Sequence, residues 1–170
     1  MKRAAGAFAT LLLAIVGLGG SAGAQPVNNE RILIIFTVAD APGRVIAVGP
    51  VSGTGVTKLL SHDEGPNGSF TDVYSLKLGS GSIVFTQTGT EDFPFDAASC
   101  SATASGQGTF TLGGGTGAFS GVTGSGRFSQ RGKIIGSRSS SGACLGPDSG
   151  AAPAALVVIE DAAGTATRPR

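Results

Sequence analysis

Four polar side chains share a strand face with apolar neighbours, and their types suit ligand binding or proton transfer: Asp72, Tyr74, Gln87 and Gln130. Asp72 and Tyr74 alternate with their neighbours so that both lie on the face of Phe70. Gln87 lies on the face of Phe85, and Gln130 lies on the face of Phe128. A carboxyl, a phenol and two amides that face a small apolar interior predict a lined pocket.

Acid–base chemistry in such a pocket would depend on Asp72. Burial disfavours the charged form of a carboxyl and raises its pKa, which suits a group that gives and takes a proton. The alternative is that these polar residues lie at the openings of the fold, where water or backbone groups satisfy them. We favour this alternative and assign no catalytic residue from the sequence.

Composition argues against most other catalytic and metal chemistry. The chain has one His and two Cys, fewer than a zinc site with three protein ligands would need alongside a disulfide. His62 stands between Ser61 and Asp63, and adjacent side chains cannot converge as a catalytic triad. We interpret residues 61–68 as the longest polar loop, with His62 in a solvated turn. We expect no metal and no cofactor.

Charge argues against a nucleic-acid partner. Twelve Lys and Arg residues against eleven Asp and Glu residues give a net charge of +1, which is too small to attract polyanions. The glycine-rich run at residues 113–117 is followed by Ala118, where a phosphate-binding loop would have Lys and then Ser or Thr.

The elements that must position these residues are short and β-rich. Segments rich in β-branched and aromatic residues are separated by Gly, Pro, Asn and Asp. There are eight: residues 32–38, 45–51, 54–60, 70–78, 83–88, 103–112, 126–136 and 155–161. Several have one apolar and one hydroxyl-rich face, which is typical of antiparallel sheets. A barrel or a sandwich would fit, and we expect an all-β fold with one antiparallel eight-stranded barrel, because closure removes exposed edges.

The N-terminus has the three parts of a secretory signal. Lys2 and Arg3 are basic, residues 4–20 carry no charge, and residues 21–24 offer the small side chains of a cleavage site. A membrane anchor is the alternative, but the apolar run is short and is not followed by basic residues. We expect no membrane span after cleavage. The expected organisation is a signal peptide (1–24), a flexible leader (25–30), a barrel (31–161) and a loose C-terminal tail (162–170).

Cys100 and Cys144 are the only cysteines, and both follow the signal. An oxidising compartment would join them, which in the chain-entropy model stabilises the fold by up to ~4 kcal/mol. Two free thiols are the alternative. Because neither belongs to a Cys-x-x-Cys pair, redox catalysis is poorly supported. We expect a disulfide and a secreted, periplasmic or extracellular location.

The motif Gly-x-Phe-Ser/Thr occurs four times, at residues 68–71, 108–111, 117–120 and 126–129. The last three copies are nine residues apart, so a solenoid is one interpretation. A calcium-binding solenoid of this period needs a carboxylate in each copy, and residues 97–147 contain no Asp or Glu. We favour the other interpretation, in which glycine turns deliver Phe side chains to a core.

The run from residue 114 to 126 resembles the Gly-Gly-Thr-Gly-x-Phe-x-Gly-Ala-x-Gly signature of allene oxide cyclase-like and dirigent-like barrels, and it is closest to their uncharacterised bacterial secreted members. The residues that carry the resemblance are Gly114, Gly115, Thr116, Gly117, Phe119, Gly121 and Gly124. The resemblance implies a cofactor-free barrel in which Phe119 closes one end and the glycines turn the chain between two strands. Thr123 stands where dirigent proteins often have Arg, and no residue matches the family's catalytic carboxylates.

These features are consistent with more than one function. The first is a secreted barrel without catalytic apparatus, which binds a small hydrophobic molecule or serves as an extracellular or envelope component. The second, implied by the resemblance, is a cofactor-free cyclase or isomerase of an apolar substrate, with Asp72 and Tyr74 as its candidate polar groups. A third is surface recognition through the hydroxyl-rich and Arg-rich face of residues 126–138. We favour the first and leave the ligand unnamed.

Overall fold

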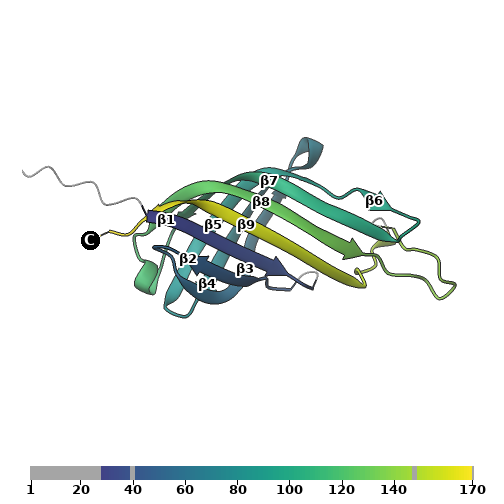
Figure 1. Ribbon diagram of the computed structural model, residues 1–170, viewed down its shortest axis with the longest axis horizontal. Coiled ribbons are helices and arrows are strands. Elements are labelled where there is room, and N and C mark those ends of the chain that lie inside the picture. Colours follow the sequence, from purple (N-terminus) through teal and green to yellow (C-terminus); the bar gives the residue numbers. More distant parts are fainter. Residues whose placement is uncertain (1–27, 39–40, 147–148, 170) are drawn as a thin grey trace, which may run out of the picture.

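A computed structural model describes residues 28–38, 41–146 and 149–169, so the predicted signal peptide lies outside the described part of the chain. Eight long antiparallel strands wrap into a barrel (Figure 1). They are β1 (Asn28–Phe36), β2 (Arg44–Val48), β3 (Gly53–Glu64), β4 (Ser69–Leu78), β5 (Gly81–Asp92), β7 (Ser101–Gly113), β8 (Thr123–Ile135) and β9 (Ala155–Thr167). A two-residue strand, β6 (Phe95–Asp96), pairs only with β7.

The barrel closes because β7 pairs with β5 as well as with β8. The remaining order is β5-β4-β3-β2-β1-β9-β8-β7, so each long strand has two neighbours. The predicted eight-stranded antiparallel barrel is therefore confirmed. The helical elements that lie wholly within the described residues are two short 3-10 turns, Pro66–Gly68 and Gly117–Phe119. No helix in this part of the chain is long and apolar enough to cross a membrane.

The barrel extends beyond the predicted range of residues 31–161 at both ends. β9 continues to Thr167, and Ala162 and Ala166 on its inner face are buried, so the expected loose tail is wrong for residues 162–167. β1 begins at Asn28 and pairs with β9 from its first residue, so the expected flexible leader is wrong for residues 28–30. Both segments are rich in small or polar residues, and they form strands because they pair with each other.

Phenylalanine rings and inward-facing glycines pack against each other across the strands. A Cβ on Gly108 would lie 2.7 Å from Cε1 of Phe128, and a Cβ on Gly126 would lie 2.7 Å from Cε1 of Phe110. The Gly-x-Phe motifs of β7 and β8 therefore leave room on one strand for a ring from the other. The expectation of glycine turns holds for Gly117, which has a φ of +58°, and is wrong for Gly108 and Gly126, which lie within strands.

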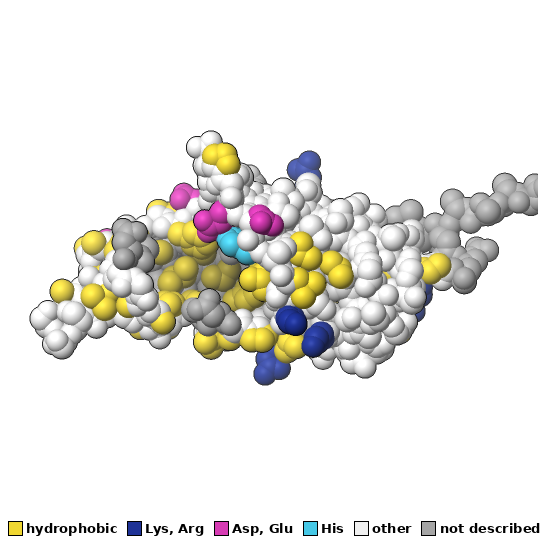
Figure 2. Space-filling model, turned by 180° about the vertical axis from the view of Figure 1, so that it is seen from behind, with side chains coloured by type: hydrophobic (Ala, Val, Ile, Leu, Met, Phe, Trp, Pro, Cys, Tyr) yellow, Lys and Arg dark blue, Asp and Glu magenta, His cyan; other side chains and the backbone are white. Residues whose placement is uncertain are grey.

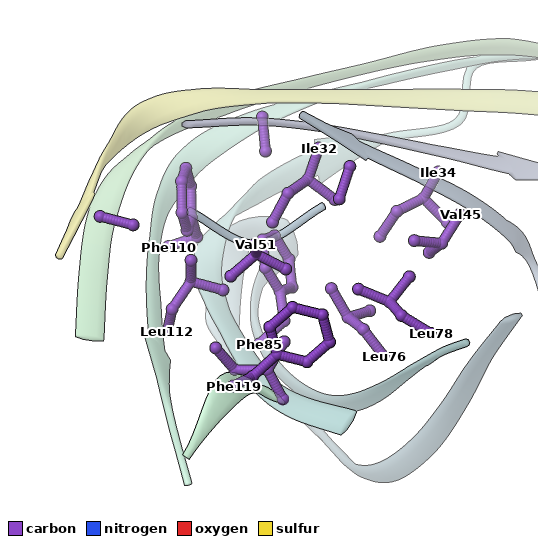
Figure 3. Close-up of a cluster of buried hydrophobic side chains, with 14 of the residues drawn as sticks. Ile32, Ile34, Val45, Val51, Leu76, Leu78, Phe85, Phe110, Leu112 and Phe119 are labelled. Atoms are coloured by element: carbon purple, nitrogen blue, oxygen red, sulfur yellow. The ribbon is translucent and has the colours of Figure 1, made fainter. Parts of the chain in front are cut away.

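Buried hydrophobic side chains form one cluster inside the barrel, and Phe119 of the loop between β7 and β8 belongs to it (Figure 3). Phe119, between β7 and β8, is buried among core side chains, and Gly114 and Gly121 beside it have positive φ angles. Thr116 fixes this loop to the β4–β5 turn, because its Oγ1 accepts a hydrogen bond of 3.1 Å from the backbone N–H of Ser82. We refer to the end of the barrel that holds this loop as the closed end.

The predicted disulfide between Cys100 and Cys144 is present, with the two Cα atoms 5.4 Å apart. It joins the start of β7 to the long connection between β8 and β9. Backbone hydrogen bonds continue the attachment, since the N–H of Gly136 donates to the carbonyl of Cys100 at 2.8 Å. The connection is thereby fixed beside the opposite end of the barrel.

Candidate functional site

A β-bulge in β3 determines which side chains of that strand face the barrel interior. Leu59 pairs with Tyr74 and Ser61 pairs with Val73, so Leu60 is an extra residue without a partner on β4. The extra residue shifts the alternation by one position, as bulges do. His62 then faces inward, directly opposite Asp72. The expectation of a loop beginning at Ser61 is wrong, because β3 extends to Glu64.

His62 and Asp72 form a close pair at this second, open end of the barrel. Nδ1 of His62 lies 2.6 Å from Oδ1 of Asp72, and Nε2 lies 3.2 Å from Oε1 of Glu64. The hydrogen bond to Asp72, followed by that to Glu64, raises the pKa of the imidazole. His62 is thus held between two carboxylates and is no isolated residue of a solvated turn.

The second oxygen of Asp72 accepts two further hydrogen bonds. The hydroxyl of Tyr74 and Nε2 of Gln87 each donate to Oδ2 at 3.1 Å. Gln87 stands opposite Asp72 in the β4–β5 ladder, and Tyr74 follows Asp72 on the same face of β4. Three residues that the alternation placed on inner faces are therefore joined in one network.

This network borders a cavity of about 510 Å³ at the open end. All four sequence-predicted residues line it: Asp72, Tyr74, Gln87 and Gln130. Apolar side chains form much of the remaining wall, among them Phe36, Leu59 and Phe93. Figure 2 shows the hollow, with hydrophobic side chains inside it and the histidine and acidic side chains along one border. We call this cavity the mouth.

Glu160 is a mouth residue that sequence reasoning missed. It lies opposite Gln130 in the β8–β9 ladder and is only 1% exposed. Burial raises the pKa of Glu160 to about 8, against a hydrogen bond from Gln87 that lowers it, so the carboxyl is largely protonated at neutral pH. The alternation of Val158, Glu160 and Ala162 on one face of β9 was the available signal.

Two further groups in the mouth have raised pKa values, and the charge of Asp72 contributes to both shifts. Burial, followed by the charge of Asp72, raises the pKa of the Tyr74 phenol. Burial and then Asp72 also raise the pKa of Glu91, while the charge of His62 opposes this shift. Tyr74 therefore stays neutral and acts as a hydrogen-bond donor at physiological pH.

Two buried oxygen atoms of the mouth residues lack a donor among the described residues: Oε1 of Gln87 and Oε1 of Glu160. Buried acceptors are normally satisfied, and each exception requires an explanation.

The four predicted residues are not all joined by hydrogen bonds, since Gln130 lines the same cavity without belonging to the Asp72 network in any described contact. Its neighbour in the ladder is Glu160.

The described residues contain no group of three or more His, Cys, Asp or Glu side chains that could hold a metal ion. Comparisons of the chain with protein-family models, with curated proteins and with solved structures found no match.

Proposed function

We propose that this protein binds a small, mainly apolar molecule in the mouth of its barrel. The observation that carries the proposal is the arrangement of the cavity, in which apolar side chains form much of the wall and polar groups gather around Asp72. Small-molecule sites typically have volumes of about 300–1,000 Å³, apolar walls and a few fixed polar groups. A volume of about 510 Å³ is in that range.

The location that we propose for this binding is outside the cytoplasm. The tripartite pattern of residues 1–24 supports export, and the Cys100–Cys144 disulfide is typical of an oxidising compartment. A secreted barrel with an open mouth is suited to capture or carry a sparingly soluble compound.

A second candidate function is cofactor-free isomerisation or cyclisation, and one observation favours it. The mouth holds a protonated carboxyl, Glu160, together with the imidazole–carboxylate pair of His62 and Asp72. The Asp72 carboxylate, paired with His62, would accept a proton from a carbon acid, and Glu160 would donate one to the developing oxyanion or to another carbon, so that one proton is taken up and one is released. The resemblance of residues 114–126 to the cyclase-like barrels agrees with this candidate.

Native mass spectrometry of protein purified from the medium or periplasm tests the binding proposal. We expect a retained small molecule, and loss of that molecule in Leu59→Arg, which places a charge on the mouth wall. Leu60→Arg is the matched control, because Leu60 is as exposed as Leu59, at 51% and 50%, but does not line the mouth. Equal retention by both variants would place the ligand elsewhere.

Turnover assays separate the two candidate functions. If the mouth is a catalytic site, Asp72→Asn and Glu160→Gln will retain a bound apolar compound but convert it at least about tenfold more slowly. If it is a binding site alone, the retained molecule will leave chemically unchanged from the wild-type protein.

A further inference from the structure

An apolar groove adjoins the mouth beside Phe95 of β6, on the face of β8 and β9 that carries Gln130 and Glu160. The groove has a volume of about 390 Å³ and is walled by Phe95, Ile134, Leu145 and Pro153, among others. Phe93 and Leu156 line both the groove and the mouth. The two spaces therefore adjoin at these two side chains.

The disulfide-linked connection between β8 and β9 supplies the outer wall of this groove. Leu145 directly follows Cys144, and its N–H donates to the carbonyl of Ser137 at 2.9 Å. At the far end of the connection, the N–H of Ala154 donates to the carbonyl of Ile135 at 2.9 Å. The described residues on both sides of positions 147–148 are thus held by one covalent bond and several backbone hydrogen bonds.

The polar side of the mouth has more acceptors than donors. Asp72, Glu91 and Glu160 are three carboxyls on its wall, and the buried Oε1 atoms of Gln87 and Glu160 receive no hydrogen bond from the described residues. Two cationic side chains line the cavity, and one of them, His62, is already held by Asp72 and Glu64. The other is Lys58. A molecule that completes this site brings hydrogen-bond donors and no further negative charge.

From these observations, and resting on the proposed function, we propose that the ligand is a linear alkyl amine. Its ammonium head lies among the carboxyls around Asp72 and Glu160, and its chain passes Phe93 and Leu156 into the groove. An ammonium group has three donors and no acceptor, which matches the surplus of acceptors. Its positive charge beside Glu160 would favour the ionised carboxylate over the protonated form of the ligand-free protein. A flexible chain, unlike a fused-ring compound, can turn from the mouth into the groove.

The chain contains one Tyr and no Trp, so its intrinsic fluorescence reports only on Tyr74 in the mouth. Titrations of the full mature protein with decylamine, hexylamine, decanol and decanoate, below their micellar concentrations, test both parts of the proposal. We expect decylamine to bind on the order of a hundredfold more tightly than hexylamine, since each buried methylene contributes up to about fourfold. We expect decylamine to bind at least about tenfold more tightly than decanol, and decanoate to bind most weakly.

A groove-filling variant tests where the chain lies. A Cβ on Gly146 would meet only Cε1 of Phe95, at 3.9 Å, so the Cβ of Gly146→Leu fits without a clash at a position that lines the groove. We expect this variant to bind hexylamine normally and decylamine at least about tenfold more weakly. Gly113→Leu is the matched control, because a Cβ there has open space and the residue lies outside the groove.

The possible outcomes separate this inference from the proposed function. If decanoate binds more tightly than decylamine, or if Gly146→Leu leaves the preference for the longer chain unchanged, the alkyl-amine inference is wrong while binding in the mouth stands. If none of the four probes perturbs Tyr74 and native mass spectrometry finds no retained molecule, the proposed function itself is wrong.

Discussion

His62 and Asp72 face each other across the β3–β4 ladder, with Nδ1 of the imidazole 2.6 Å from Oδ1 of the carboxylate. The pair exists because the bulge at Leu60 shifts by one position which residues of β3 face the interior. A network of Asp72 with Tyr74 and Gln87 then fixes the carboxylate, which in turn fixes the ring. The bulge thus converts an exposed strand end into one side of a polar site.

Replacing Asp72 by Asn will lower the pKa of His62, because the hydrogen bond to Asp72 is the largest cause of its elevation. Glu64→Gln will lower it by less, and Asp63→Asn, on the outer face, will leave it nearly unchanged. Since His62 is the only histidine, its NMR titration is free of overlap. An unchanged pKa in Asp72→Asn would contradict the observed pairing.

The same pair gives stability a defined pH dependence. A histidine whose pKa is raised on folding stabilises the protein below its ordinary pKa, and that contribution is lost as pH rises through the folded value. The deficit of Asp72→Asn relative to wild type will therefore be larger at about pH 5 than at about pH 9. Urea unfolding at both pH values measures the difference, with Asp63→Asn as the control.

Glu160→Gln will stabilise the barrel at alkaline pH. The pKa of Glu160 is about 8 in the folded protein, against an ordinary value of 4.5, so folding of the wild type weakens as pH rises between these values. The neutral glutamine removes this loss, with a gain on the order of 2–4 kcal/mol at about pH 9 and almost none at about pH 4. Urea unfolding across this range is the measurement.

Glu30 at the closed end provides the comparison for Glu160. Burial raises the pKa of Glu30 to about 7, despite the hydrogen bond that its Oε2 accepts from the N–H of Val51 at 2.9 Å. Glu30→Gln will therefore remove the loss of stability that Glu30 causes between about pH 4.5 and pH 7, and Glu160→Gln the loss that Glu160 causes between about pH 4.5 and pH 8. Identical profiles for wild type and Glu160→Gln would show that Glu160 is charged in the folded protein.

Gly108→Ala will destabilise the barrel by about 1–3 kcal/mol. The new methyl group would collide with the carbonyl of Thr88 and lie 2.7 Å from the ring of Phe128, which is buried and has little room to move. Gly113→Ala, on the same strand with nothing within 4 Å of its Cβ, will change stability by no more than about 0.5 kcal/mol. Equal effects of the two substitutions on urea unfolding would contradict the packing of glycine against phenylalanine.

Removing the disulfide by Cys100→Ser with Cys144→Ser will cost about 2–4 kcal/mol of unfolding free energy, because the bond constrains residues 44 positions apart. Unfolding in urea measures the cost. A reductant will destabilise the wild type by a similar amount and leave the double variant unaffected. A wild type that is insensitive to complete reduction would contradict this expectation.

Simple alternation was enough to find the parts of the site on regular strands. β4 and β5 contain no bulge in their shared ladder, so a period of two correctly placed Asp72 and Gln87 on inner faces. The same rule fails on β3, because one extra residue at Leu60 exchanges the two faces and no local feature of the sequence marks it. A strict period of two therefore predicts a loop at His62, where the structure has a strand.

The length of the C-terminal strand was underestimated for a different reason. Ala162 and Ala166 carry too little apolar surface to mark a core strand, yet both are buried because β1 and β8 pair with β9 on either side. Glu160 lies one residue before the end of the segment predicted at residues 155–161, whereas in the structure it lies in the middle of the β8–β9 pairing. Such residues owe their burial to partners far away in sequence.

The pairing of the first strand with the last has a practical consequence for handling the protein. Asn28 lies opposite Ala166, so β1 starts where β9 ends, at the closed end and away from the mouth (Figure 1). A barrel tethered to a sensor chip or resin at the start of β1 or at the end of β9 presents its opening to the solution. The pairing also permits circular permutation, in which a short linker joins β9 to β1 and new termini are cut in the β4–β5 turn, without any added chain crossing the opening.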